Sequence, residues 1–244
     1  MTWVKICGMT NLEDALVAVD AGADAVGFVF YEKSPRNVNV ETAREIVEKL
    51  PENLEKVGVF VNAACSTWVD AMKKANLTAV QHYLPLEPDV ESHQKAMTTG
   101  EFAKAAKFFV SFPMGLLIEA SADLDQLGAD LKHFRDDAPG PRPVPDGVFD
   151  TFFFDSGDVK GPGGSGKTFD WAKAVHMAEE MKRDGLKLVV SGGLTAKNVG
   201  EAINILQPWG VDVASGVEAS PGKKDPEKVR AFVRAVREMD RRAS

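Results

Sequence analysis

The stretch KLVVSGGLTAKNVGEAINILQPWGVDVASG (residues 187–216) contains two short β-branched runs separated by a segment with helical spacing. The runs are Lys187–Val190 and Val211–Ala214, and a turn of small residues follows each of them. Thr195 is the expected N-cap of the helix between them. The stretch therefore predicts a strand, a helix and a second strand, with two similar loops after the strands.

The same alternation continues toward the N-terminus and predicts eight strands in all. They are Trp3–Ile6, Ala25–Phe30, Val57–Val61, Thr78–Gln81, Gly115–Ile118, Thr151–Phe154, Lys187–Val190 and Val211–Ala214. For the fifth strand, Lys107–Phe112 is an alternative to Gly115–Ile118. Eight strand–helix units in 244 residues predict an α/β fold of the (β/α)8 (TIM) barrel type.

We expect one domain over residues 1–244, because a division in the middle would leave each half with an incomplete set of strands. The proline-rich segment DDAPGPRPVPDG, residues 136–147, is expected to be an exposed loop insertion. Thr10 with Glu13 resembles a capping box at the first helix, Gly22 is expected to end that helix, and Asp225 before Pro226 is an expected N-cap of the last one.

The composition argues against several classes of protein. The net charge is -7 and the Lys and Arg residues are scattered, so a nucleic-acid partner is not expected. No apolar run approaches the roughly 18 residues of a membrane helix. The N-terminus lacks a basic region followed by an apolar core, and two cysteines are too few for a disulfide scaffold, so we expect a reducing, cytoplasmic location.

In a closed parallel barrel the residues that follow the strands meet at one face, where function is to be sought. Here this set comprises Cys7, Arg36, Gln81, His82, Asp155, Ser191–Gly193 and Ser215–Gly216. The last two loops, VVSGG and DVASG, are both small turns before a helix, and free backbone N–H groups at such turns favour a phosphate. We therefore expect a phosphate site at Gly192, Gly193, Ser215 and Gly216.

Cys7 and Asp155 are expected to face each other across the barrel mouth. The pair has the chemistry of a base and an acid, provided that the surroundings bring the pKa values toward neutrality. Lys5 lies two positions from Cys7 on the same strand, points the same way, and would favour the thiolate. Taken alone, Cys7 is more often a packing residue and Asp155 a loop cap, so the prediction depends on the pair.

Arg36 follows Ser34 and Pro35 on a stiffened loop, which suits a guanidinium that holds a carboxylate, although a solvated surface arginine is the ordinary alternative. His82 is as consistent with a structural histidine as with a functional one. No role is assigned to Cys65, and the pattern predicts no metal site.

The segment GPGGSGKT, residues 161–168, fits the P-loop pattern. A P-loop should begin directly after its strand, whereas residues 155–160 intervene here. We therefore favour a glycine loop that closes over a substrate and not a nucleotide site.

Six blocks resemble the phosphoribosylanthranilate isomerase family, in that family's order. They are KICGMT, GADAVGFVFYEKSPRNV, VGVFVN, GGSGKTFDW, SGGLTAKNV and VDVASGVEASPGKKD, which run from Lys5 to Asp225. The match is weak only from about Leu84 to Thr151. The family usually has VQLHG after strand four, whereas this chain has VQHYL, so Tyr83 stands where a histidine is expected.

The resemblance implies an Amadori rearrangement of N-(5-phosphoribosyl)anthranilate in tryptophan biosynthesis, without metal or cofactor. It implies that Asp155 is the acid, that Cys7 is the base and that Arg36 holds the anthranilate carboxylate. Gly193, Ser215 and Gly216 match residues whose backbone contacts the phosphate in the family. We also expect Lys5, Gln81 and Asp212 to bind the substrate. The alternatives are a related sugar-phosphate isomerase and an inactive barrel that binds a phosphorylated ligand. The expected partner is a phosphorylated small molecule, and a monomer and a homodimer both remain open.

Overall fold

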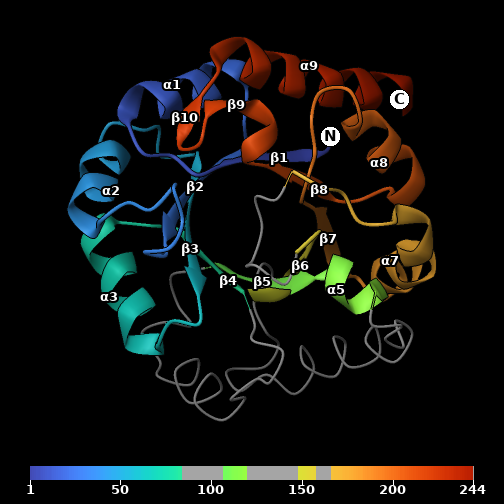
Figure 1. Cartoon of the computed structure of the whole chain (residues 1–244), viewed down its shortest axis with the longest axis horizontal. Coiled ribbons are helices and arrows are strands. Elements are labelled where there is room, and N and C mark those ends of the chain that lie inside the picture. The colour runs from blue at the N-terminus through green and yellow to red at the C-terminus, as the bar shows by residue number, and fades with distance from the viewer. Residues whose placement is uncertain (84–106, 120–147, 158–165, 244) are drawn as a thin grey trace.

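The computed structural model describes residues 1–83, 107–119, 148–157 and 166–243. Eight parallel strands form a closed barrel in the order β1 to β8, and helices surround it on the outside (Figure 1). The strands are β1 Trp3–Cys7, β2 Ala25–Phe30, β3 Glu55–Val61, β4 Ala79–Tyr83, β5 Lys107–Pro113, β6 Val148–Asp155, β7 Lys187–Val190 and β8 Gly210–Val213. The ring closes where β8 pairs with β1. The prediction of a (β/α)8 barrel is confirmed.

The described helices lie along the outside of this ring; α1 to α8 lie between successive strands in the chain, and α9 follows the last strand. They are α1 Leu12–Ala21, α2 Val40–Val47, α3 Cys65–Ala75, α5 Met114–Glu119, α7 Val175–Arg183, α8 Val199–Leu206 and α9 Pro226–Ala243, with short 3-10 turns η1 Trp171–Ala174 and η2 Ser215–Val217. A small antiparallel pair, β9 Glu218–Ser220 and β10 Lys223–Lys224, follows β8. None of the helices in the described part of the chain is long and apolar enough to cross a membrane.

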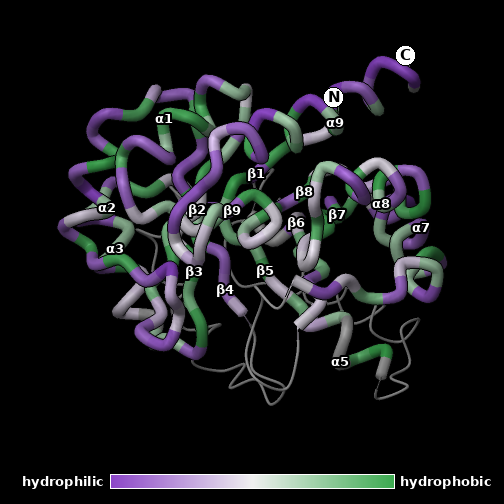
Figure 2. The backbone as a smooth tube through the Cα atoms, turned by 45° about the horizontal axis from the view of Figure 1, so that its top comes forward, coloured by the Kyte–Doolittle hydropathy of each residue, from purple (hydrophilic) through white to green (hydrophobic). Residues whose placement is uncertain are grey.

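Alternation along the strands divides the buried side chains into two clusters. One cluster fills the space between strands and helices and includes Phe60, Trp68 and Phe232. The other lies inside the barrel and includes Phe109 and Phe153. Successive side chains of a strand point to opposite faces, so β1 to β7 supply residues to both clusters, whereas Val211 and Val213 of β8 belong to the outer one. In Figure 2 the C-terminal end of α9 is hydrophilic.

The fifth strand shows where the expectation from sequence was wrong. Gly115–Ile118 belongs to α5, and Lys107–Pro113 is β5, which was the alternative. Phe108, Phe109 and Val110 are buried and pair with β4 and β6. Two apolar runs stand next to each other here, and only the barrel partners decide which of them is the strand. The proline-rich segment 136–147 and residues 161–165 of the P-loop pattern lie outside the described residues.

The helix ends confirm some of the expected caps and correct others. Gly22 ends α1 with φ 88°, and the Asp225 carboxylate accepts hydrogen bonds from the backbone N–H groups of Glu227 and Lys228 at the start of α9. The N-cap of α1 is Asn11, not Thr10, because the Asn11 side chain accepts from the backbone N–H of Asp14. Thr10 instead donates its hydroxyl proton to the Gly222 carbonyl, at 2.6 Å, and so connects the first loop to the last.

The start of α8 also differs from the expectation. Thr195 was the expected N-cap, but the helix begins at Val199 after Asn198. The Asn198 carboxamide oxygen accepts from the Thr195 backbone N–H at 2.7 Å. Thr195 therefore belongs to a turn that the Asn198 side chain closes, one turn ahead of the helix.

Candidate active site

Lys5 and Asp212 form a buried ion pair inside the barrel. Their strands are neighbours, with Lys5 opposite Asp212 in the register, and Lys5 Nζ lies 3.0 Å from Asp212 Oδ1. Lys5 is fully buried, and its ammonium also lies over the Phe153 ring, 5.3 Å from the centroid. Burial opposes the charged form, but Asp212 and the neighbouring Cys7 outweigh it and raise the pKa of Lys5, so the ammonium persists in the barrel.

Cys7 lies at the end of β1, above this pair. Burial raises the pKa of the Cys7 thiol, the Lys5 ammonium opposes that rise, and the Asp212 carboxylate adds to it. Gly27, its register partner on β2, leaves the room that the thiol needs: a Cβ there would lie 2.7 Å from Cys7 Sγ. Lys224 is a second cation that opposes the rise, but burial outweighs both cations, so the pKa of Cys7 lies above its usual value and not closer to neutrality as expected.

Asp155 ends β6 and is held by three donors. Its Oδ2 accepts from Tyr83 Oη at 3.1 Å and from Ser191 Oγ at 3.0 Å, and its Oδ1 accepts from the Gly157 backbone N–H at 2.9 Å. Burial and the negative charge of Asp155 raise the pKa of Tyr83 well above its usual value, so the phenol remains a donor. Tyr83, noted in the sequence only as a departure, is therefore part of the site.

The Asp212 carboxylate interacts electrostatically with both expected catalytic groups, Cys7 and Asp155. Burial raises its pKa, Lys5 opposes this, and the charge of Asp155 raises it further. The same carboxylate raises the pKa of Cys7. Although β1 and β6 are not neighbours, Cys7 and Asp155 therefore share the environment of Asp212.

Arg36, in the loop after β2, already holds a carboxylate within the chain. Its Nε and Nη2 donate to the two oxygens of Glu218, each at 2.8 Å. Its aliphatic part crosses Gly8, where a Cβ would lie 2.6 Å from Arg36 Cδ. The guanidinium is therefore fixed next to the residue that follows Cys7.

The two loops expected to bind phosphate are packed against each other. A Cβ on Gly216, after β8, would lie 1.8 Å from the carbonyl oxygen of Leu194, after β7. A Cβ on Gly193 would lie 2.3 Å from the Lys167 carbonyl carbon. Only glycine permits these approaches, which place the loop of Gly192 and Gly193 against the loop of Ser215 and Gly216. Ser156, also buried there, has a hydroxyl oxygen without a hydrogen-bond partner among the described residues.

The two residues before Tyr83 point in opposite directions. Gln81 points into the barrel, where its Nε2 donates to Ser111 Oγ at 2.8 Å, and its Oε1 is buried without a partner among the described residues. His82 is buried in contact with the outer cluster, and its ring centroid lies 6.0 Å from that of Trp68. The structure therefore favours the structural interpretation of His82.

Glu218 and Lys224 belong to the site but were not singled out in the sequence. Lys224 is buried, and its Nζ donates to Glu218 Oε1 at 3.0 Å and to the Ala214 carbonyl at 3.2 Å. Both residues stand in the block VEASPGKK that follows the last strand. The signal that could have identified them is the presence of charged residues directly after the last barrel strand.

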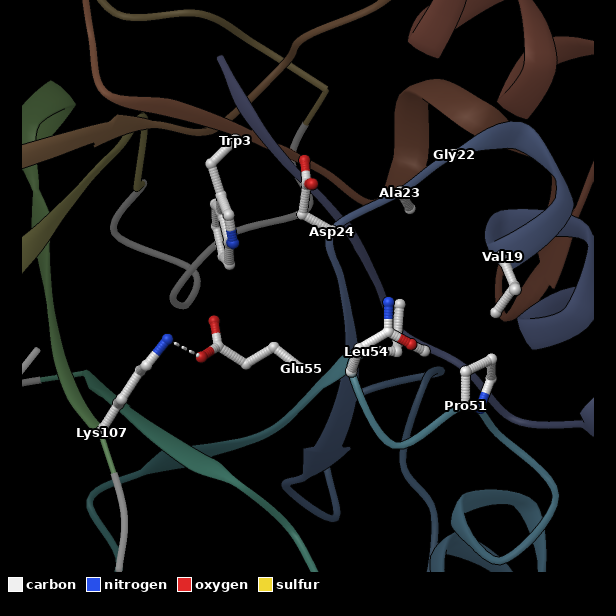
Figure 3. A pocket seen from close by; sticks show the side chains of 10 residues that line it. Trp3, Val19, Gly22, Ala23, Asp24, Pro51, Leu54, Glu55 and Lys107 are labelled. Carbon is white, nitrogen blue, oxygen red and sulfur yellow. Dashed lines mark ion pairs between the residues drawn. The ribbon is translucent and has the colours of Figure 1, made fainter. Parts of the chain in front are cut away.

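A hollow of about 530 Å³ lies at the other end of the barrel, where the strands begin. Figure 3 shows Trp3, Asp24 and Glu55 around it, with Lys107 bonded to Glu55. Active sites of such barrels lie at the carboxyl ends of the strands, so this hollow is not the site described above. In the described part of the chain, no three His, Cys, Asp or Glu side chains gather as a metal site would require.

The fold and the site together define the class of protein: a (β/α)8-barrel enzyme. The family model for N-(5'phosphoribosyl)anthranilate (PRA) isomerase matches residues 4–97 and 143–235. The chain belongs to the N-(5'-phosphoribosyl)anthranilate isomerase family, the isomerases of tryptophan biosynthesis, as the resemblance indicated.

Relatives match the chain over almost its full length. An N-(5'-phosphoribosyl)anthranilate isomerase of Pseudomonas paraeruginosa is 40% identical over 98% of this chain and 96% of its own length. The N-(5'-phosphoribosyl)anthranilate isomerase of Pelobacter propionicus is 37% identical over 98% of this chain and 97% of its own length. The crystal structure of the Thermotoga maritima enzyme has a TM-score of 0.74 at 35% identity and covers 98% of this chain and 100% of its own.

Two further solved structures bear on ligand and assembly. A phosphoribosyl anthranilate isomerase in complex with reduced 1-(o-carboxyphenylamino)-1-deoxyribulose 5-phosphate has a TM-score of 0.73 at 34% identity, over 98% of this chain and 100% of its own. Another, over the same shares of the two chains, is described as monomers generated from the dimeric Thermotoga maritima enzyme, with a TM-score of 0.72 at 34% identity.

Proposed function

We propose that this chain converts N-(5-phosphoribosyl)anthranilate to 1-(2-carboxyphenylamino)-1-deoxyribulose 5-phosphate, with Asp155 as general acid and Cys7 as general base. The observation that carries the assignment is the buried position of both groups at one rim of the barrel, where each interacts with Asp212. The proposed reaction is inferred from the family, and the proposed roles are inferred from the chemistry of the two side chains.

The acid step opens the ribose ring. Asp155 gives its proton to the ring oxygen, the bond between that oxygen and C1 breaks, and the anilino nitrogen shares its lone pair with C1 to form an iminium. Tyr83 and Ser191 both donate to Oδ2 of this carboxyl group. Their hydroxyl groups then stabilise the carboxylate that remains after the proton has left.

The base step moves a hydrogen from C2 to C1. The Cys7 thiolate removes the C2 proton, the electron pair of that bond forms an enolamine, and a proton returned to C1 gives the ketoamine. The Lys5 ammonium favours the thiolate that this step requires, against the effect of burial. Asp212 keeps Lys5 charged and in position.

The remaining contacts hold the two ends of the substrate. Backbone N–H groups of Gly192, Gly193, Ser215 and Gly216 bind the phosphate in this proposal. Arg36 holds the anthranilate carboxylate, as the next subsection develops. Gln81 and Asp212 face the sugar from inside the barrel, and the unpartnered Oε1 of Gln81 is an acceptor for a sugar hydroxyl.

The test follows the loss of substrate fluorescence when purified protein is mixed with fresh N-(5-phosphoribosyl)anthranilate. We expect rapid loss with the parent and a fall of about 10²- to 10⁴-fold in both Cys7→Ala and Asp155→Asn. Cys65→Ala and Asp170→Asn are the matched controls, since Asp170 is a surface residue whose side chain is 51% exposed. A folded parent without activity would refute the proposed function, and active Cys7 or Asp155 variants would refute the roles.

We also propose a cytoplasmic location, which the free, buried thiol of Cys7 supports. Size-exclusion chromatography with light scattering separates the monomer from the homodimer, the two assemblies that we propose.

A further inference from the structure

Three charged side chains meet beside the thiol: Arg36, Glu218 and Lys224. All are largely buried, with side-chain exposures of 11% for Arg36, 5% for Glu218 and 0% for Lys224. Two cations share one anion, so the group carries a surplus of positive charge while Lys224 is protonated; burial lowers the pKa of Lys224, and Glu218 and Cys7 oppose this. Because a buried charge is costly without a partner, the surplus favours an anionic ligand at this place.

The hydrogen bonds decide which edge of the Arg36 guanidinium faces that ligand. Glu218 occupies Nε and one N–H of Nη2. A guanidinium has five N–H donors in a plane, so both donors of Nη1 and the second donor of Nη2 remain. Nη1 has no hydrogen-bond partner among the described residues and is not enclosed by them. Two of these three donors, one on Nη1 and one on Nη2, form an end-on fork whose spacing fits one carboxylate.

Glu218 is itself held from three sides. Lys224 Nζ bridges Glu218 Oε1 to the Ala214 carbonyl at the end of β8, and Lys228 Nζ donates to the Glu218 carbonyl at 2.8 Å. Burial would raise the pKa of Glu218, but its hydrogen bonds with Arg36 and Lys224 and their charges lower it below its usual value, so the carboxylate stays ionised. The Arg36 fork is therefore attached to the barrel wall through Glu218.

We infer that Glu218 is a positioning residue that determines specificity: it orients Arg36 so that the free fork accepts the aromatic carboxylate of the substrate. The inference rests on the proposed function and adds the residue that positions Arg36 to recognise the substrate carboxylate. The Glu218 side chain bonds to Arg36 and Lys224 and not to Cys7 or Asp155, so in this inference it acts on binding of the carboxylate and not on the proton transfers.

The experiment compares two substrates that differ only in the carboxylate, N-(5-phosphoribosyl)anthranilate and N-(5-phosphoribosyl)aniline. In Glu218→Gln one acceptor oxygen becomes an NH2 group, which opposes Nη2 and releases the fork. We expect kcat/KM for the carboxylated substrate to fall about tenfold to hundredfold, mostly through KM, and that for the aniline compound to change less than about threefold. Product is followed by chromatography for both substrates.

Further variants separate orientation from loss of structure. Glu218→Asp keeps the charge but is one methylene too short for both hydrogen bonds, so it should lose part of the same substrate preference. Arg36→Ala should abolish the preference, and adding Glu218→Gln to it should cause no further loss. Glu13→Gln, on an exposed side chain bonded to Lys223, is the control and should leave both substrates unchanged.

Each outcome supports or overturns the inference. Equal losses for both substrates, additive effects of the two substitutions, or an unchanged preference in Glu218→Gln would each overturn it. These results leave the proposed function intact as long as the parent converts the carboxylated substrate. A folded parent that does not convert it would overturn the proposed function and this inference with it.

Discussion

Replacing Gly27 by alanine should displace the Cys7 thiol, the proposed general base, while leaving the barrel closed. Gly27 lies on β2 opposite Cys7, and the added methyl carbon would lie 2.7 Å from Cys7 Sγ and 3.0 Å from Lys5 Cε. Non-bonded heavy atoms prefer separations of about 3.5–4.0 Å, so the sulfur must move by about 1 Å. The end of β1 cannot move freely with it, because Gly8 and Met9 both donate to the Gly27 carbonyl at 2.9 Å.

The magnitude follows from that displacement. Overpacking of a buried site costs about 1–3 kcal/mol of unfolding free energy. For a domain of this size each kcal/mol lowers the melting temperature by about 2–4 °C, so we expect a decrease of about 2–12 °C. A misplacement of about 1 Å at a reacting group costs about a hundredfold in rate, which we expect for kcat/KM in Gly27→Ala.

Activity is measured by the loss of substrate fluorescence and stability by thermal unfolding followed by circular dichroism. Gly200→Ala is the control, because its methyl group would meet only the flexible Met239 side chain, with Sδ at 3.3 Å. It should keep kcat/KM within about twofold of the parent. A Gly27→Ala variant with parental activity and melting temperature would refute the reasoning.

Two further predictions concern pH. Lys5→Met removes a cation that opposes the effect of burial, so the pKa of Cys7 should rise further. The acidic limb of the kcat/KM profile should then move to higher pH. A profile measured from pH 6 to 10 in which this limb does not move would contradict the prediction. At Asp240, burial would raise the pKa, but hydrogen bonds from Thr2 and Arg237 outweigh burial and lower the pKa. The ionised carboxylate therefore stabilises the fold above the pKa that Asp240 has in the unfolded state, and this stabilisation is lost as the pH falls through the pKa of the folded state. Asp240→Asn should therefore lower the free energy of unfolding more at pH 7 than at pH 3 in urea titrations, and equal losses at the two pH values would show that the carboxylate charge is not the cause.

The regular parts of the fold were predictable because their signals are local. Strands and helices alternate with periods of 2 and 3.6 residues, and caps such as Asp225 act within one turn of the helix that they begin. The errors occurred where two local solutions compete. Lys107–Pro113 and Met114–Glu119 are both apolar, and pairing with β4 and β6 selects the first of them as the strand.

The positions of the candidate site residues followed from one topological rule, that residues after parallel strands meet at one end of the barrel. It predicted Cys7, Asp155 and the loops of Gly193 and Gly216 without any contact being known. Their hydrogen-bond partners did not follow from it. Tyr83 bonds to Asp155 from a strand 72 positions earlier in the chain, and no periodicity connects the two.

The sequence by itself determined the barrel, the end of it at which the candidate site residues meet and the residue types available there. Only the tertiary structure decided which charges are paired, because Arg36 and Glu218 lie 182 positions apart and Lys5 and Asp212 lie 207 apart. Periodicity and capping depend on neighbours within a few residues. Pairing of buried charges depends on the closed ring, which brings the first strand against the last and leaves each charge few partners within reach.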